Sequence, residues 1–365
     1  MERMTEELCA LVTNIPSPYR IRVFELVKSI PLLVLFCSRT EPNRRWKVPH
    51  LAFEHLFLSG RYLAKKDGFN FIHHNPSILR ELSRRAPRVV VTTGFNPTHL
   101  YAFLWAIFMG SHHVCMTDGC IESEAGLSWV HRWVRILVFR FSQAFIAASQ
   151  GGADLYRSYG IPEEKIFRSF LCADNDLFFS RSGTDERSYD VCFSGQLQER
   201  KQPLFFAEIC HGVQQKRGRC RALILGEGPL KAALIDRLES YGIDYDFPGF
   251  LDQEALPGAY ASARLLLFPT LHDPWGVVVN EAMAAGTPVI TSSHAGAARE
   301  LVVDGVTGYI CDLNLEDWVA RVLQILEAPQ VWRELSENAK DRVRPYCYAN
   351  AAKGIEDACA YVLSK

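Results

Sequence analysis

Two carboxylates stand eight residues apart in a segment, residues 269–290, that reads as strand, loop, helix and strand. Asp273 precedes the helix and Glu281 lies inside it. Acids placed in this way can each accept a pair of hydroxyl hydrogen bonds from different parts of one long ligand. Gly276 allows close approach of the backbone, and the helix after it offers free N–H groups and a positive dipole end. The segment predicts a site for an anion or for sugar hydroxyls.

This segment resembles the signature of the retaining glycosyltransferase family 4 (glycosyl transferases group 1), which has the GT-B fold and two glutamates separated by seven residues. The resemblance implies that Asp273 holds hydroxyls of a donor sugar and that Glu281 holds the ribose of a nucleotide. It also implies that backbone N–H groups reach sugar and phosphate from Trp275, Gly276 and Val277. The chain departs from the family at Asp273, where glutamate is usual, so the identity of the sugar stays open.

The segment that ends in Lys201 resembles the family's phosphate loop, with Gly195 as its glycine. Lys201 matches the lysine that holds the diphosphate as a compact positive charge and helps the leaving group depart. Gln196 replaces the usual arginine, and Gln202 replaces the glycine after the lysine. Arg200 either supplies the missing charge or is a solvated arginine at a helix start. Both interpretations are open.

Two shorter patterns have weaker implications. Gly228 belongs to a Gly-x-Gly-Pro turn that resembles the family's turn after the next strand, and it either contacts the donor or only reverses the chain. Residues 174–176, Asp-Asn-Asp, match a metal-binding motif of the other large glycosyltransferase fold, yet here they resemble the turn that ends the first domain. We expect no metal and no cofactor, because lysine and helix dipoles can neutralise a diphosphate.

The first half offers fewer candidates. Arg20 follows the first strand at a helix start, where it either meets an anion on the acceptor side or only caps the helix. Asp118 ends a strand where the family commonly has a histidine near the reacting carbon, so the resemblance implies a catalytic role beside Lys201 and Asp273. A plain turn aspartate before glycine is the alternative. Glu122 and Glu124 either bind acceptor hydroxyls or are solvated.

Short apolar runs alternate with amphipathic stretches along the chain, which indicates α/β architecture with parallel sheets covered on both faces. The predicted strands are 9–14, 32–37, 88–93, 113–117, 144–148, 166–171, 189–193, 221–225, 264–268, 288–291 and 308–311. The predicted helices are 98–109, 126–141, 203–215, 230–241, 276–285, 314–326 and 351–363. We therefore expect two Rossmann-like doubly wound domains with an interdomain cleft. The expected limits are 1–183, 184–346 and a C-terminal helix at 347–365 that packs back on the first domain.

The charge of the chain is divided unevenly. The net charge of −1 excludes a wholly basic nucleic-acid binder, yet residues 1–180 hold 21 Lys/Arg against 16 Asp/Glu. Basic and aromatic residues are mixed in 44–47 and 131–141, which fits either peripheral contact with anionic lipid or an ordinary half-buried helix. The polar, acidic N-terminal residues and the scattered cysteines predict a reduced cytoplasmic protein. It is either free in the cytoplasm or bound to the inner face of the cytoplasmic membrane.

Together these features predict a retaining hexosyltransferase that moves a sugar from a nucleotide-diphosphate donor to a glycan or lipid-linked acceptor. Cell-envelope or exopolysaccharide synthesis is the expected setting. Two alternatives are open. One is a GT-B nucleotide-sugar epimerase or hydrolase, and the other is a sugar-binding subunit whose catalytic residues have decayed, which the substitutions at Asp273, Gln196 and Asp118 motivate.

Overall fold

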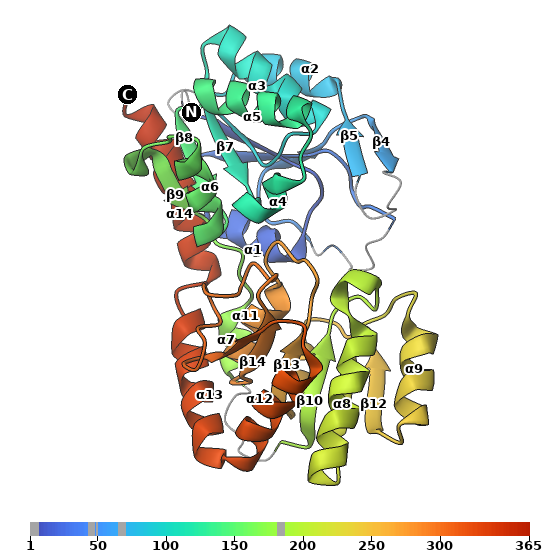
Figure 1. Ribbon diagram of the computed structural model, residues 1–365. Coiled ribbons are helices and arrows are strands. Elements are labelled where there is room, and N and C mark those ends of the chain that lie inside the picture. The colour runs from blue at the N-terminus through green and yellow to red at the C-terminus, as the bar shows by residue number, and fades with distance from the viewer. Residues whose placement is uncertain (1–6, 43–47, 49, 65–70, 181–186) are drawn as a thin grey trace. The chain divides into compact units, whose positions relative to one another are not determined.

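The computed structural model describes residues 7–42, 48, 50–64, 71–180 and 187–365, and the chain divides into two compact units (Figure 1). The first unit comprises the residues up to Leu171 together with Tyr348–Lys365, and the second comprises Cys172–Cys347. The predicted boundary at 183/184 falls outside the described residues. Helix α7 (Asn175–Phe179) lies in the second unit, because Asn175 Nδ2 donates to the main-chain oxygens of Val343 and Tyr346, at 3.1 Å each.

The main sheet of the first unit is parallel, with the order β3-β2-β1-β6-β7-β8-β9. Its strands are β1 (Cys9–Thr13), β2 (Leu32–Phe36), β3 (His55–Phe57), β6 (Val89–Thr92), β7 (His112–Thr117), β8 (Ala144–Ala147) and β9 (Ile166–Arg168). A separate antiparallel pair consists of β4 (Arg61–Ala64) and β5 (Phe71–His74). The central strands are rich in β-branched and apolar residues and are fully buried, as expected for strands covered on both faces.

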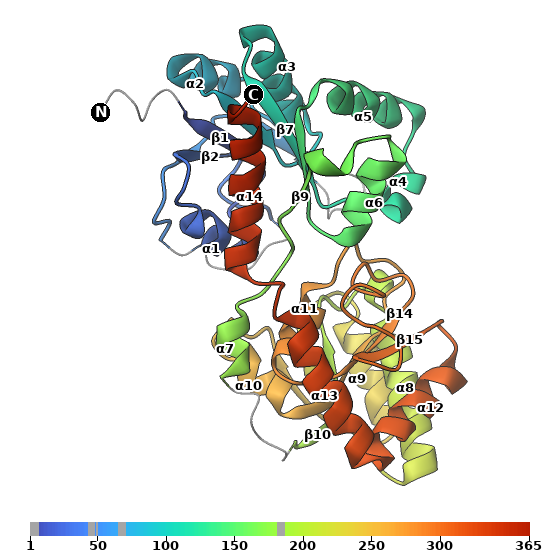
Figure 2. The same cartoon turned by 90° about the vertical axis from the view of Figure 1, so that its left-hand side faces the viewer.

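Helices cover both faces of this sheet (Figure 2). Helices α2, α3, α5 and α6 share one apolar layer with the strands, and α1 and α14 lie on the other face. Helix α14 is fixed there by Glu356, whose Oε1 accepts hydrogen bonds from the N–H groups of Lys28 at 2.6 Å and Ser29 at 2.7 Å. The helices are α1 (Pro18–Leu26), α2 (Ser77–Arg85), α3 (Pro97–Met109), α4 (Ile121–Ala125), α5 (Trp129–Phe141), α6 (Gln150–Ser158), the 3₁₀ turn η2 (Glu163–Lys165) and α14 (Tyr348–Leu363).

The second unit has a parallel sheet with the order β12-β11-β10-β13-β14-β15. The strands are β10 (Tyr189–Ser194), β11 (Arg221–Leu225), β12 (Asp244–Gly249), β13 (Ala263–Phe268), β14 (Val289–Ser292) and β15 (Gly308–Cys311). The remaining elements are the 3₁₀ turn η3 (Glu199–Lys201), α8 (Pro203–Arg217), α9 (Lys231–Ser240), α10 (Leu256–Ala261), α11 (Val277–Ala284), α12 (Leu315–Glu327) and α13 (Pro329–Val343). Helices α8, α9 and α12 cover one face, around the buried Phe193, Phe206 and Trp318.

Each sheet has a point where the strand order reverses. In the second unit the chain runs outward from β10 to β12, then returns to β13 on the other side of β10 and continues to β15. In such doubly wound sheets, ligands bind in the crevice at the carboxyl ends of the two central strands. The expected α/β class with two doubly wound parallel sheets is confirmed. In the second unit the two strands at the reversal point are β10 and β13, so a ligand is expected at the loops that follow them.

Two further features concern the whole described chain. Each of the eleven cysteines is a free thiol, and ten of them are buried, which fits their scattered positions in apolar runs. Within the described residues, none of the helices combines the length and the apolar character that a membrane span requires.

Candidate active site

The ion pair between Lys201 and Asp273 joins the two loops at the reversal point of the second sheet. Lys201 ends η3 in the loop after β10, and Asp273 lies in the loop after β13. Lys201 Nζ donates to Asp273 Oδ2, and the side chains are 8% and 12% exposed. Arg200 Nη1 donates to the same carboxylate oxygen at 3.1 Å and to the carbonyl oxygen of His272 at 3.1 Å. Three of the predicted donor-site residues therefore meet at one carboxylate.

Burial and charge act against each other in this cluster. Burial lowers the pKa of Lys201 below the ordinary lysine value, although the nearby Asp273 opposes that shift. Burial alone would raise the pKa of Asp273, but Lys201, the N–H of Trp275 and Arg200 together hold it below the usual range. The ammonium group of Lys201 also lies 4.4 Å from the centre of the Phe268 ring, a cation–π contact. The pair is thus a charged carboxylate held beside a cation at the edge of a buried region.

The loop from Asp273 to helix α11 is shaped by Gly276. Its φ of +95° is left-handed, and a Cβ at this position would lie 2.7 Å from Phe268 Cε1, so a side chain does not fit. Gly276 is the N-cap of α11 and Val277 is its first residue, which places the free N–H groups of the first helical turn at this loop. Trp275 is buried, with its Nε1 donating to Asn280 Oδ1 at 2.8 Å.

The backbone N–H of Trp275 has a partner within the protein. It donates to Asp273 Oδ1 at 3.0 Å. This bond holds the carboxylate with one oxygen on the backbone and the other on Lys201. Of the three predicted backbone donors, Gly276 and Val277 are the two at the start of the helix.

Glu281 lies inside α11 and is 2% exposed. Tyr260 of α10 donates its hydroxyl to Glu281 Oε2 at 2.8 Å and lies 2.6 Å from Ser194 Oγ at the end of β10. Burial, followed by the charge of Glu281, raises the pKa of the Tyr260 phenol well above its ordinary value, so the phenol remains a donor. The phenol of Tyr260, from α10, thereby orients the Glu281 carboxylate.

The glycine turn after β11 packs against the loop after β10. A Cβ on Gly228 would lie 2.4 Å from the main-chain oxygen of Leu197, so the two loops touch only because this residue has no side chain. Gly195 follows β10 directly, and Gln196 Oε1 accepts a hydrogen bond from Gln198 Nε2 at 3.1 Å. Gly228 therefore shapes the site through packing.

Gln202, at the family's glycine position, has a left-handed φ of +55°.

In the first unit the structure brings Arg20 and Asp118 together. Arg20 Nη2 donates to Asp118 Oδ1 at 3.2 Å, and Arg20 Nη1 donates to the carbonyl oxygen and to Oγ of Ser169, at 3.1 Å each. The Arg20 side chain is 11% exposed, whereas that of Asp118 is 57% exposed. Asp118 thus remains accessible at the carboxyl end of β7, while Arg20 is held by its neighbours. That Asp118 acts together with Lys201 and Asp273 stays a prediction.

The other first-unit candidates have less open surroundings. Glu124 of α4 forms an ion pair with Arg135 of α5, and both side chains are nearly buried, so Glu124 holds two helices together. Glu122 lies in the same helix, but its side chain is outside what the structure describes. In α7, Asp174 caps the helix by accepting from the N–H of Leu177 at 3.3 Å. Within the described ranges, no group of three or more His, Cys, Asp or Glu residues is arranged to hold a metal.

Sequence patterns missed three residues that pack against or hydrogen-bond to one another and the predicted site residues, namely Ser194, Tyr260 and Phe268. Ser194 could have been found, since it lies between the predicted strand 189–193 and Gly195. Tyr260 comes from α10, a six-residue helix with little periodicity, and it has no local signal. Phe268 lies in the predicted strand 264–268, but only the fold shows that its ring contacts Lys201 and lies against Gly276.

Comparison with known proteins shows which proteins this chain is similar to. Residues 174–342 match the family described as Glycosyl transferases group 1. An uncharacterized glycosyltransferase of Methanocaldococcus jannaschii is 25% identical over 240 residues, 61% of this chain and 61% of the relative. An N-acetyl-D-galactosaminyltransferase of Campylobacter jejuni, named for an undecaprenol-linked acceptor, is 27% identical over 219 residues, 60% of each chain. The chain thus spans about three fifths of the length of these relatives.

A solved structure covers nearly the whole chain. The HepE protein of Anabaena, crystallised in complex with UDP, has a TM-score of 0.74 and 15% identity over 98% of this chain and 99% of that chain. At this identity the likeness shows the fold. The motif residues gathered at the reversal point of the second sheet lie inside the segment that matches the glycosyl transferases group 1, and the likeness to HepE shows the GT-B fold.

Proposed function

We propose that the protein is a retaining hexosyltransferase that moves a sugar from a nucleotide-diphosphate donor to a glycan or lipid-linked acceptor. The observation that carries the proposal is the buried ammonium group of Lys201, paired with Asp273 at the reversal point of the second sheet. A buried cation beside a helix N-terminus is suited to a diphosphate, whose charge grows as the leaving group departs. No metal is required in this arrangement.

Each residue of the second unit has a role in the proposed donor complex. Lys201 and the first N–H groups of α11 hold the diphosphate, Asp273 accepts hydroxyls of the sugar, and Glu281 accepts the ribose hydroxyls. Arg200, bound to the Asp273 carboxylate, adds positive charge where the family's arginine is missing. In this way the site compensates for Gln196, whose side chain is neutral.

The proposed reaction needs no nucleophile from the protein. The bond between the anomeric carbon and the diphosphate oxygen breaks, and its electron pair stays on the diphosphate. The acceptor hydroxyl then attacks the same face and gives its proton to the leaving phosphate oxygen. Asp118 stabilises the positive charge that develops on the sugar. Retention of configuration follows, because bond cleavage and bond formation occur on one face.

We further propose that the protein works in cell-envelope or exopolysaccharide synthesis, at the inner face of the cytoplasmic membrane. The Campylobacter jejuni relative supports this setting, since it is named for an undecaprenol-linked acceptor. Saccharides on such lipids are presented at a membrane surface.

The test is a panel of nucleotide-diphosphate sugars incubated with the protein, with and without glycan and lipid-linked acceptors, in the presence and absence of EDTA. Nucleotide release that depends on an acceptor, persists in EDTA and yields a glycoside of unchanged anomeric configuration supports the proposal. Release that no acceptor alters shows an epimerase or hydrolase instead. Acceptor binding without turnover of any donor shows a binding subunit.

A further inference from the structure

Helix α5 exposes large apolar side chains along one side. It buries Arg135, Val138 and Phe139 against the first unit. Trp129 and Trp133 are 72% and 62% exposed. We define the α5 surface as the exposed residues of this helix that are apolar or basic, namely Trp129, Val130, Arg132, Trp133, Ile136, Leu137, Arg140 and Phe141.

This surface is unusual for a protein in contact with water only. Ile136, Leu137 and Phe141 are each nearly half exposed and follow the two tryptophans along consecutive turns, so the apolar groups form one stripe. Soluble proteins rarely leave large contiguous apolar patches uncovered unless the patch binds a partner or a membrane. The residues between the apolar ones include arginines, and none of the thirteen residues of α5 is acidic. The stripe is therefore cationic as well as apolar.

A pocket opens at the C-terminal end of the same stripe. It has a volume of about 360 Å³ and lies between α5 and the segment 159–165 that leads to β9. Its apolar lining includes Ile136, Phe139 and Tyr159, and its cationic lining consists of Arg140 and Lys165. None of the described residues that line it is acidic. Ile136 and Arg140 belong to both the pocket and the α5 surface, so the two are continuous.

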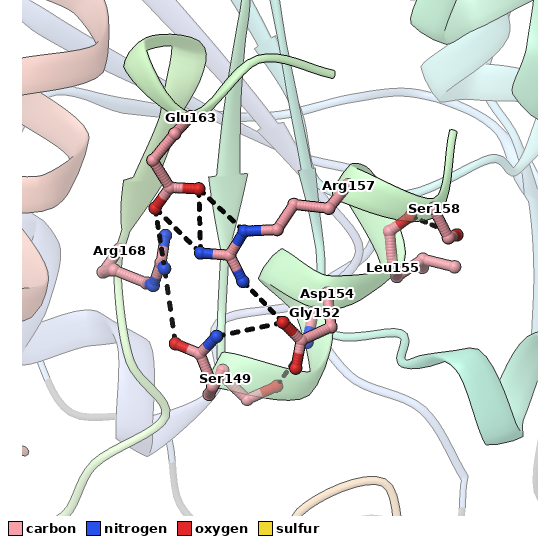
Figure 3. Close-up of polar contacts among 9 residues, drawn as sticks. Ser149, Gly152, Asp154, Leu155, Arg157, Ser158, Glu163 and Arg168 are labelled. Carbon is pink, nitrogen blue, oxygen red and sulfur yellow. Dashed lines mark hydrogen bonds and ion pairs between the residues drawn. The ribbon is translucent and has the colours of Figure 1, made fainter. Parts of the chain in front are cut away.

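The charges around this pocket leave its two cations available. Among the residues that the structure describes, neither Arg140 nor Lys165 forms an ion pair. The nearby Glu163 is engaged elsewhere, because its carboxylate accepts from Arg157 Nε and Nη2 at 2.8 Å each and from Arg168 Nη2 at 3.3 Å (Figure 3). An anion at the pocket therefore meets two positive charges without competition from this carboxylate.

We propose that the α5 surface docks the protein on an anionic lipid bilayer and that the pocket takes the phosphate of one lipid headgroup between Arg140 and Lys165. Tryptophan suits the boundary between headgroups and acyl chains, since its ring is apolar and its N–H is polar. Arginine and lysine beside such residues attract anionic lipids and hold phosphate oxygens. The apolar walls of the pocket accommodate the upper part of an acyl chain.

A second copy of the chain is a poorer occupant. Symmetric pairing through α5 would bring the same cationic surface of two copies together, and like charges at an interface are unfavourable. An anionic membrane instead offers opposite charge and an apolar interior to the same surface. The charge of the α5 surface thus favours lipid.

The proposal goes beyond sugar transfer, and its test needs no donor or acceptor. Purified protein is floated with vesicles of phosphatidylcholine alone or with about one third phosphatidylglycerol. The variants are Trp129→Gln/Trp133→Gln and Arg140→Gln/Lys165→Gln. Matched controls are Leu63→Gln, which removes another exposed apolar side chain, and Arg80→Gln/Arg84→Gln, which removes the same charge from α2. Circular dichroism and melting curves establish that all variants fold.

The expected result is strong binding to the anionic vesicles, weak binding to phosphatidylcholine, and release by high salt. Each α5 or pocket variant should bind the anionic vesicles at least tenfold more weakly, while both controls bind like the wild type. Equal binding of the wild type and the Arg140→Gln/Lys165→Gln variant overturns the pocket assignment. Inorganic phosphate or glycerol phosphate that binds the pocket without any vesicle binding overturns the lipid assignment. A dimer that the tryptophan variant dissociates, in a protein that binds no vesicle, shows a second copy as the occupant.

Failure of this proposal leaves the proposed transfer intact, because turnover with a water-soluble acceptor does not need the α5 surface. Conversely, a protein that binds anionic vesicles through α5 but turns over no donor retains the docking surface and loses the proposed function.

Discussion

Lys201 and Asp273, 72 residues apart, form a buried ion pair that links the loops after two neighbouring strands, β10 and β13. A buried pair of this kind is costly to desolvate, and removing one partner leaves the other charge uncompensated. Its place at the reversal point of the sheet gives the pair a functional meaning, since ligands of doubly wound sheets bind there.

Asp273→Asn should lower activity strongly without unfolding the loop. The asparagine oxygen can still accept the N–H of Trp275, which keeps the backbone in place, but it no longer balances Lys201 or Arg200. We expect kcat to fall about 100-fold, as when one charge-stabilising group is lost from an active site. Steady-state kinetics with the preferred donor measure the effect. Wild-type kcat in a folded Asp273→Asn protein would refute the role of this carboxylate.

Gly276→Ala should damage the donor site and the second unit together. The residue has a left-handed backbone, and the new Cβ would press on the Phe268 ring. We expect a loss of about 1–3 kcal/mol in the free energy of unfolding and weaker donor binding. Gly258→Ala is the control, because it lies in a helix with nothing within 4 Å of the added Cβ. Urea unfolding compares the two variants, and equal midpoints would show that the Phe268 contact is not restrictive.

Gln202→Gly should stabilise the second unit slightly. Gln202 has a φ of +55°, a conformation that costs a residue with a side chain about 1–2 kcal/mol, whereas glycine loses about 0.5–1 kcal/mol of that gain through unfolded-state entropy. The expected net gain is a few tenths of a kcal/mol to about 1 kcal/mol. Gln198→Gly, at an extended φ of −139°, should instead destabilise the protein. Loss of stability in both variants would mean that the Gln202 side chain contributes more than its backbone costs.

Two buried histidines should make the first unit sensitive to acid. Burial lowers the pKa of His99 and of His113 to about 3, against about 6.5 in the unfolded chain. Between these values the unfolded chain takes up protons that the folded chain does not, so the free energy of unfolding falls as the pH is lowered from 6.5. The slope is about 1.4 kcal/mol per pH unit for each histidine.

His99→Leu should therefore reduce that slope by about 1.4 kcal/mol per pH unit between pH 5.5 and 4. Urea titrations at a series of pH values give the slope, and His131→Leu, on the exposed side of α5, is the control. An unchanged slope in His99→Leu would show that this ring takes up its proton in the folded state.

Most strands of the two parallel sheets were predictable because they are apolar on both faces. Strands β11 and β15 have the predicted bounds, and the other predicted strands overlap observed ones. Strand β12 was missed, since it lies at a sheet edge and its sequence Asp-Tyr-Asp-Phe-Pro-Gly lacks an apolar run. Strand β3 was missed for a similar reason, as a three-residue edge strand that is only half buried.

The site residues that belong to local sequence motifs were predictable. The contacts that the fold makes between distant segments were not. The motifs identified Lys201, Asp273 and Glu281, and the fold places the first two in contact. Patterns could not show that the Trp275 N–H is bound to Asp273 or that Glu124 pairs with Arg135. These contacts depend on loop geometry and on the packing of α4 against α5. The phenol of Tyr260 on Glu281 likewise joins residues from separate helices.

The central claim is that the second unit binds a nucleoside diphosphate through Lys201, and isothermal titration of nucleoside diphosphates tests it most directly. The wild type and Lys201→Ala are compared, with Lys353→Ala, an exposed lysine paired with Asp357 on α14, as the control. We predict that at least one nucleoside diphosphate binds the wild type and Lys353→Ala equally, and binds Lys201→Ala at least tenfold more weakly, a difference of about 1.4 kcal/mol. Equal dissociation constants for the wild type and a folded Lys201→Ala would contradict the claim.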